Sequence, residues 1–160
     1  MIEKKNSFVY EEYNDVDACS PEIKELFKIA IEAKNKAYAP YSNFKVGAAI
    51  LLDNGEIFIG NNQENAAYPS GLCAERVAIF SAKAQYPNAS IKSLVIVSSA
   101  KNITEPIAPC GSCRQVLAEY EFSQEEPFDI YLETGDARII RILSAQSLLP
   151  FSFHSKMLNA

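Results

Sequence analysis

The sequence predicts a single α/β domain, in which a mixed sheet carries helices on its faces. Apolar residues return at helical spacing in residues 20–38 and 72–86, a turn signal lies between two apolar runs in residues 45–60, and residues 93–99 form a β-branched run. A hairpin followed by strand–helix–strand crossovers gives a mixed sheet with a parallel part. The length of 160 residues fits one domain with a real core.

The N-terminal residues 1–19 carry aromatic and acidic residues without a firm period. We expect an N-terminal extension that Phe8, Tyr10 and Tyr13 pack against the rest, followed by a domain that spans residues 20–160.

The first helix is expected over residues 20–38. Ser20 can cap its N-terminus, and Pro21 suits the first turn. The apolar positions that recur at helical spacing are Ile23, Leu26, Phe27, Ala30, Ala33 and Ala37.

A hairpin, a loop and a second helix are expected next. Residues 45–52 and 56–60 lie on either side of "DNG", which is a strong hairpin signal. Residues 61–71 form a polar loop, and residues 72–86 have a helical pattern. The apolar run at 93–99 is typical of a buried strand.

The remaining elements follow a second loop that ends at Pro109. A helix over residues 110–121 places Cys113, Val116, Leu117 and Tyr120 on one face. Residues 128–133 and 137–143 are expected to be strands around a turn, and residues 144–153 a short helix with an aromatic tail.

Composition excludes several classes of protein. Apolar residues at 48% and charged residues at 22% are ordinary for a soluble globular chain. A formal net charge of −5 argues against a nucleic-acid partner, which usually requires an excess of Lys and Arg. No apolar run approaches the length of a membrane span, and the acidic N-terminus does not resemble a signal peptide. We therefore expect a cytoplasmic protein with no membrane partner.

Three of the four cysteines lie where helices are expected to begin. Cys73 opens the second helix, and Cys110 and Cys113 lie on the first turn of the third. Helix N-termini favour thiolate over thiol. If these helices follow neighbouring parallel strands, they begin at the same edge of the sheet, where open α/β folds bind their ligands.

A CxxC pair by itself admits three interpretations: a redox pair, a structural zinc site or a catalytic one. A redox pair has no use for a third cysteine, and structural zinc needs four ligands. The candidates for a fourth ligand are Cys19 and His154, which lie far from the others in sequence. Three ligands with one open position are typical of catalytic zinc.

Glu75 favours the catalytic interpretation, because it places a carboxylate two residues after Cys73. Water activated by zinc needs a base to take its proton and an acid to return the proton to the leaving group. One carboxylate can do both, and zinc deaminases have this arrangement. The ordinary alternatives are buried cysteines and a helix-start carboxylate that the dipole favours.

The chain resembles the small, homotetrameric cytidine deaminases from Ala37 to about Phe153. The shared stretches are "AYAPYSNFKVGAAI", "NQENAAYPSGLCAER" and "PCGSCRQV", followed by the weaker "SLLPFSF". The family's deaminase fold agrees with the expected order of elements, and residues 20–160 would be its catalytic domain.

The resemblance implies a role for individual residues. Cys73, Cys110 and Cys113 would hold one zinc ion per subunit, and Glu75 would shuttle protons. Asn62 and Glu64 would bind the ribose hydroxyls and Phe44 would pack against the pyrimidine. The backbone of Ala74 would contact the base, as would the carbonyl of Ser112 or Pro109. The side chains expected to complete a neighbouring subunit's site are Ala66, Tyr68 and Phe153.

Some of these roles are physically plausible without the resemblance. A carboxylate and an amide suit the hydroxyls of a neutral nucleoside, and Glu64 would repel a phosphate. Arg76 could offset the negative charge of three thiolates by donating hydrogen bonds to them. Ordinary alternatives remain: Arg76 as a surface ion-pair residue, Asn62 and Glu64 as loop residues, and Phe44 as part of the core.

The function expected from the resemblance is zinc-dependent hydrolytic deamination of cytidine and 2′-deoxycytidine to uridine and 2′-deoxyuridine, in pyrimidine salvage. A deaminase of a modified cytosine nucleoside, such as blasticidin S, would use the same core. A nucleic-acid-editing deaminase fits the acidic composition less well. A non-catalytic, zinc-stabilised binding module would have no need of Glu75.

Overall fold

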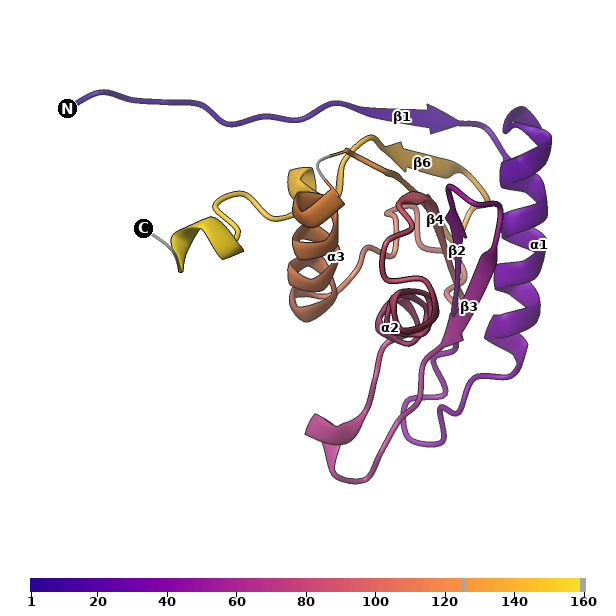
Figure 1. Cartoon of the computed structure of the whole chain (residues 1–160). Coiled ribbons are helices and arrows are strands. Elements are labelled where there is room, and N and C mark those ends of the chain that lie inside the picture. Colours follow the sequence, from indigo (N-terminus) through magenta and orange to yellow (C-terminus); the bar gives the residue numbers. More distant parts are fainter. Residues whose placement is uncertain (125, 159–160) are drawn as a thin grey trace.

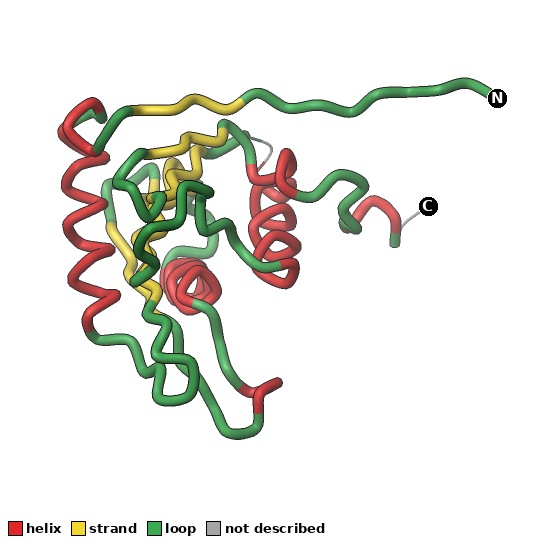
Figure 2. The backbone as a smooth tube through the Cα atoms, turned by 180° about the vertical axis from the view of Figure 1, so that it is seen from behind, coloured by secondary structure: helices red, strands yellow, loops and turns green. Residues whose placement is uncertain are grey.

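The chain folds into one mixed six-stranded sheet with a helix on one face and two on the other, as Figures 1 and 2 show. The computed structural model describes residues 1–124 and 126–158. The main elements are β1 (Tyr10–Tyr13), α1 (Pro21–Asn35), β2 (Val46–Leu52), β3 (Ile57–Asn61), α2 (Ala74–Gln85), β4 (Ile91–Ser98), α3 (Gly111–Gln124), β5 (Asp129–Glu133) and β6 (Ile139–Ile142). The predicted α/β class and the predicted hairpin are confirmed.

The strand order is β1-β6-β5-β4-β2-β3. Among the strands of the described residues, β4 and β5 pair in parallel and the other neighbouring pairs are antiparallel. The expectation that α2 and α3 follow neighbouring strands is wrong, because β2 lies between β3 and β4. The residues of β2 from Gly47 to Leu52 are all buried, as expected for a strand in the interior of the sheet. β3 is partly exposed, as expected for an edge strand.

The sheet has an apolar core on each face, because side chains along a strand alternate between faces. Ala48, Ile50 and Leu52 of β2 face α2 and α3, whereas Ala49 and Leu51 face α1. In Figure 1, α1 stands on the opposite side of the sheet from α2 and α3.

Local signals determine where the helices begin. Ser20 Oγ accepts a hydrogen bond from the backbone N–H of Ile23 at 3.4 Å, which confirms the predicted cap of α1. Gly60 allows α2 to approach β3 closely, since a Cβ at Gly60 would lie 2.1 Å from the carbonyl oxygen of Ala74. The start of α2, which carries Glu75, therefore lies directly against the sheet.

The N-terminal extension contributes β1, a strand that the sequence pattern did not predict. β1 pairs with β6, and Glu11 and Glu12 form ion pairs with Arg141 and Arg138 at 2.9 and 2.6 Å. Of the three aromatic residues expected to pack against the domain, Tyr13 does so, against the core on the α1 side of the sheet, whereas Phe8 and Tyr10 are 49% and 54% exposed. Backbone hydrogen bonds to β6 hold β1 at the edge of the sheet. In Figure 1 the chain before β1 extends past the sheet.

The C-terminal part leaves β6, forms a 3₁₀ helix at Ala145–Leu148 and passes α3 before it extends away from the domain (Figure 1). The predicted short helix is thus confined to one turn. Among the described helices, none is both long and apolar enough to cross a membrane.

Candidate active site and metal centre

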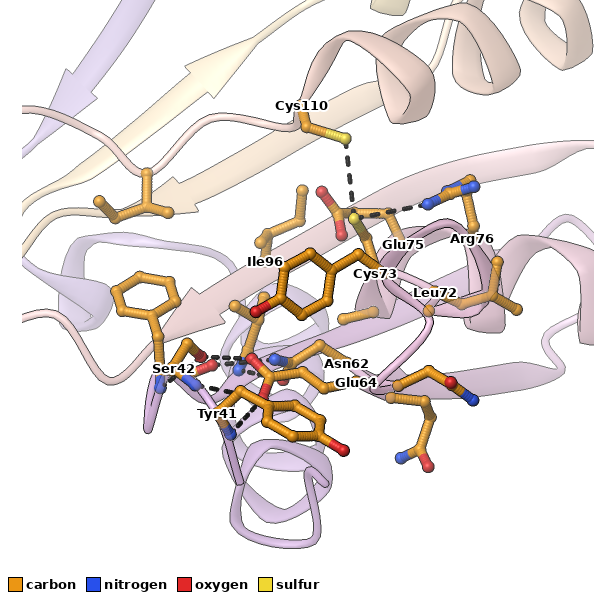
Figure 3. Close-up of a pocket in the computed structure, with 18 of the residues that line it drawn as sticks. Tyr41, Ser42, Asn62, Glu64, Leu72, Cys73, Glu75, Arg76, Ile96 and Cys110 are labelled. Carbon is orange, nitrogen blue, oxygen red and sulfur yellow. Dashed lines mark hydrogen bonds between the residues drawn. The ribbon is translucent and has the colours of Figure 1, made fainter. Parts of the chain in front are cut away.

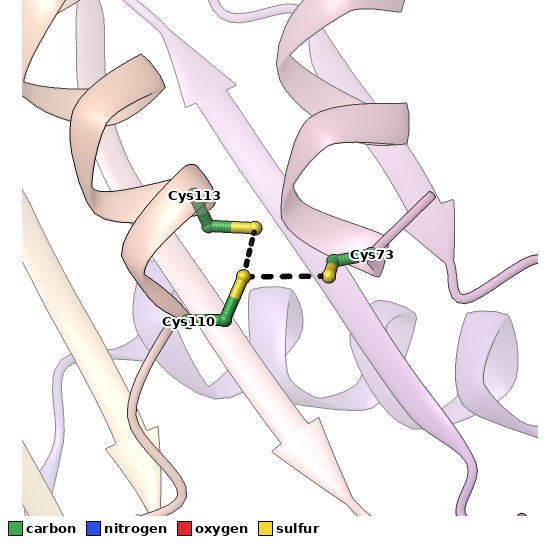
Figure 4. A group of neighbouring side chains, drawn as sticks. All are labelled: Cys73, Cys110 and Cys113. Atoms are coloured by element: carbon green, nitrogen blue, oxygen red, sulfur yellow. Dashed lines mark hydrogen bonds between the residues drawn. The ribbon is translucent and has the colours of Figure 1, made fainter. Parts of the chain in front are cut away.

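Three cysteine sulfurs from two helix starts meet at one edge of the sheet. Cys73 is the N-terminal cap residue of α2, Cys110 directly precedes α3, and Cys113 lies in its first turn. Cys110 Sγ lies 3.6 Å from Cys73 Sγ and 3.6 Å from Cys113 Sγ, and all three sulfurs lie within 4.8 Å of one another (Figure 4). Although β2 separates the strands that precede them, α2 and α3 begin at the same edge.

The cluster fits a zinc ion. Zinc–sulfur bonds of about 2.3 Å in a tetrahedron place sulfurs about 3.8 Å apart, close to the two separations of 3.6 Å. Neither of the other candidate ligands is nearby: Cys19 is buried in the core beneath α1, and the His154 ring stacks on Phe122 at 4.4 Å. Three thiol ligands leave a fourth position open, as catalytic sites require.

Arg76 lies beside the sulfur cluster. Its Nη2 donates to Cys73 Sγ at 3.7 Å, and its Nε is buried without a partner among the described residues. Hydrogen bonds from the Cys113 thiol and from Arg76 lower the pKa of Cys73 to about 5, whereas the bond to Cys73 together with burial raises the pKa of Cys113. The surroundings therefore favour a thiolate at Cys73, the form that binds metal.

Glu75 lies in the first turn of α2 with only 5% of its surface exposed. Burial raises the pKa of its carboxyl group above the ordinary value, and the charge on Cys73 adds to this effect. A raised pKa brings a carboxyl group closer to neutral pH, where it can both accept and donate a proton. Its position beside the sulfurs, seen in Figure 3, suits a proton shuttle.

The sulfur cluster and Glu75 adjoin a cavity of about 710 Å³, large enough for a small-molecule ligand. Most residues predicted for the site line this one cavity, although they come from separate loops and helices: Phe44, Asn62, Glu64, Tyr68, Cys73, Ala74, Glu75, Arg76 and Cys110. Tyr68, which lines this cavity, is 79% exposed.

Asn62 and Glu64 hold the neighbouring loop of residues 41–46. The Asn62 side chain donates to the carbonyl of Phe44 at 2.9 Å and accepts from the N–H of Val46 at 2.8 Å. The Glu64 carboxylate accepts from the backbone of Tyr41 at 2.8 Å, and from both the N–H and the hydroxyl of Ser42. These bonds lower the pKa of Glu64, so it is an ionised acceptor at the cavity wall.

Three predicted site residues do not line the cavity in the single chain, and one of them, Cys113, is fully buried beside it in the sulfur cluster. Ala66 is exposed in the loop before the 3₁₀ helix Tyr68–Ser70, and Phe153 is 54% exposed on the C-terminal segment. The cavity wall also contains residues that the sequence did not predict for the site, among them Tyr41, Ser42, Leu72, Ile96, Ile107 and Ala108. Tyr41 and Ser42 could have been found, because they lie three and two residues before Phe44 within the polar break "APYSNF".

Comparison with known proteins agrees with this geometry. Residues 20–124 match the family described as "Cytidine and deoxycytidylate deaminase zinc-binding region". The chain is 38% identical over 135 residues to the cytidine deaminase of Halalkalibacterium halodurans, a match that covers 84% of this chain and 96% of that protein. It is 42% identical over 99 residues to the cytidine deaminase of Sporosarcina psychrophila, covering 62% and 70% of the two chains.

Solved structures show the same fold. The crystal structure of cytidine deaminase from Burkholderia pseudomallei is 43% identical, with a TM-score of 0.69 over 81% of this chain and 98% of that one. Cytidine deaminase from Mycobacterium tuberculosis is 33% identical, with a TM-score of 0.64 over 84% and 98% of the two chains.

Proposed function

This chain belongs to the cytidine deaminase family, and on that premise we propose that it hydrolyses cytidine and 2′-deoxycytidine to uridine and 2′-deoxyuridine with release of ammonia. The observation that carries the proposal is the position of Glu75, a buried carboxylate, beside three sulfurs that can share one metal ion. We place residues 20–160 in the catalytic domain.

One zinc ion per chain is the cofactor, and Cys73, Cys110 and Cys113 would hold it. When bound, zinc acts as a Lewis acid that makes water a nucleophile at neutral pH. Three thiolates reduce the positive charge of the centre, and Arg76 would offset part of this through its bond to Cys73.

Glu75 moves the protons of the reaction. Its carboxylate accepts a proton from the attacking water and donates it to ring N3 as the water oxygen bonds to C4. It then transfers the second proton of that oxygen to the exocyclic nitrogen. The bond between C4 and this nitrogen breaks, ammonia leaves, and a carbonyl remains at C4. The buried position of Glu75 limits exchange of these protons with bulk water.

The cavity wall provides for a neutral nucleoside. Glu64 can accept a ribose hydroxyl and Asn62 can donate to one, by sharing or exchanging their bonds to the 41–46 loop. Phe44 would pack against the pyrimidine. The backbone of Ala74 and a carbonyl of Pro109 or Ser112 would contact its polar edge. The carboxylate of Glu64 disfavours a phosphate near the sugar.

Activity with cytidine is the direct test. Purified protein should remove the absorbance band of cytidine and release one ammonia for each uridine formed. Treatment with a zinc chelator should abolish the activity, and added zinc should restore it. Zinc binding without any turnover of cytidine or 2′-deoxycytidine would instead identify a non-catalytic module.

We place the reaction in the cytoplasm and in pyrimidine salvage. Free thiols that act as metal ligands suit a reducing compartment, and all four cysteines of this chain are free. The substrate is a nucleoside, with no nucleic-acid or membrane partner.

We also place the active enzyme in a homotetramer with shared sites. Tyr68 and Phe153 are exposed in the single chain at 79% and 54%, and Ala66 lies in the same exposed loop as Tyr68. Exposed apolar side chains of this kind often mark contact surfaces. In the assembly, these residues would complete the cavity of a neighbouring subunit.

Replacement of Phe153 by alanine is expected to weaken substrate binding or assembly but to leave zinc in place, because Phe153 is not among the groups that can hold the ion and lies far in sequence from each of them. Subunits with Glu75→Gln and subunits with Phe153→Ala are then mixed under conditions that exchange subunits. Some mixed sites would contain an intact Glu75 and a neighbour's intact Phe153, so activity should partly return. No recovery after efficient mixing, or a fully active monomer in sedimentation, would exclude shared sites.

A further inference from the structure

Three side chains of α3 hold the C-terminal segment of residues 144–153. Glu121, Arg114 and Gln115 bond this segment near its start, middle and end, respectively. In Figure 1 the segment passes the end of α3 before it leaves the domain. None of the three has a part in the reaction described above.

Glu121 makes the most extensive of these contacts and is only 2% exposed. One carboxylate oxygen accepts from the backbone N–H groups of Ala145, at 2.7 Å, and Phe128, at 3.2 Å. The other oxygen accepts from the N–H of Gln146 at 3.0 Å and from the Ser144 hydroxyl at 2.5 Å. It forms no ion pair with any described residue, so the partners of its carboxylate are three backbone N–H groups and the Ser144 hydroxyl.

Arg114 joins this segment to the loop that carries Cys110. Its Nη1 donates to the carbonyl of Leu148 at 3.1 Å, and its Nε donates to the carbonyl of Pro109 at 2.8 Å. Arg114 therefore connects the loop that ends at Cys110 with the 3₁₀ helix Ala145–Leu148, whose first residues Glu121 holds.

Gln115 bonds the far end of the segment. Its Nε2 donates to the carbonyl of Phe153 at 2.7 Å, and Phe153 is 54% exposed. The ring has little packing of its own in the single chain. Its place therefore depends on the backbone that α3 holds.

A carboxylate suits these contacts better than an amide does. All of its neighbours are donors, and both of its oxygens accept. Glutamine has the same shape, but its NH₂ group would face at least one backbone N–H. A buried donor left without an acceptor is costly, so the segment would open more often.

We propose that Glu121 is a positioning residue, which fixes the course of residues 144–153 and thereby the point from which Phe153 reaches the site of a second copy of this chain. The proposal deepens the proposed function and rests on the role given there to Phe153.

The test compares Glu121→Gln with Glu126→Gln in the zinc-loaded, full-length enzyme. Glu126 lines the same cavity of about 430 Å³ between α3 and residues 144–146, but it is exposed, and among the described residues its carboxylate accepts from no backbone N–H. Glu121→Gln should accelerate amide hydrogen exchange of residues 145–153 by about tenfold. It should also raise KM about fivefold, because only the fraction of subunits with an ordered tail binds substrate well. kcat and zinc content should stay within about twofold, and Glu126→Gln should change none of these quantities.

A double-mutant cycle separates this coupling from general damage. If Glu121 acts through Phe153, the Glu121→Gln/Phe153→Ala enzyme should have the KM of Phe153→Ala alone. The proposal would be overturned if the KM increases of the two single variants multiplied in the double variant. It would also be overturned if amide exchange of residues 145–153 were unchanged in Glu121→Gln. A Phe153→Ala enzyme with unchanged KM would refute the role of Phe153 itself, which is a separate failure. If Glu121→Gln does not fold, Gln115→Ala removes the distal contact alone and should shift exchange and KM in the same direction.

Discussion

Replacing Glu75 with glutamine is expected to lower kcat by about 10⁴-fold, at the upper end of what one acid–base group contributes, because the same carboxylate serves several proton transfers. Glutamine keeps the size of the side chain and one of its acceptors, but it cannot take a proton from water. Zinc content and cytidine binding should survive, since the sulfur cluster is formed by other residues. Steady-state kinetics, metal analysis and equilibrium binding on the same preparation measure all three quantities.

Glu56→Gln is a suitable control for the Glu75 substitution. Glu56 is exposed in the turn between β2 and β3, so the same chemical change there should leave kcat and zinc content unaltered. A decrease in kcat of less than tenfold for Glu75→Gln would assign the proton transfers to another group.

Replacing Cys110 with alanine is expected to release the metal during mild chelation and to lower kcat/KM by about 10³-fold or more, because the water then keeps a pKa near its value in bulk solvent. Cys110 lies 3.6 Å from each of the other two sulfurs, so its loss removes the shared member of the cluster. Zinc analysis should give close to one ion per chain for the unaltered protein and close to none for the variant.

Cys19→Ala is the matched control for Cys110→Ala. Cys19 is also a free cysteine, but it is buried in the core beneath α1, away from the cluster. Its replacement should cost some stability through lost packing and leave zinc and activity in place. A Cys110→Ala protein that retains full zinc, or an unaltered protein with two ions per chain, would contradict the three-thiolate site.

The chemistry of the site could be predicted because its residues form short local motifs. Cys110 and Cys113 are three residues apart at a helix start, and Glu75 follows Cys73 by two, so local geometry brings each set close together. The helix cap at Ser20 and the hairpin turn that contains Gly55 are equally local, and both are found in the structure. Gly55 has the positive φ of +86° that this turn requires.

The sequence by itself thus determined the fold class, the order of the elements after residue 20 and the residue types that can bind zinc and move protons. Only the tertiary structure decided that β2 lies between β3 and β4, that β1 joins the edge of the sheet, and that Glu121 holds residues 144–146. The physical reason is that caps, turns and periodicity depend on neighbours within a few residues. Strand order and buried polar contacts depend instead on which distant surfaces gain most by leaving water together, and no local pattern records that choice.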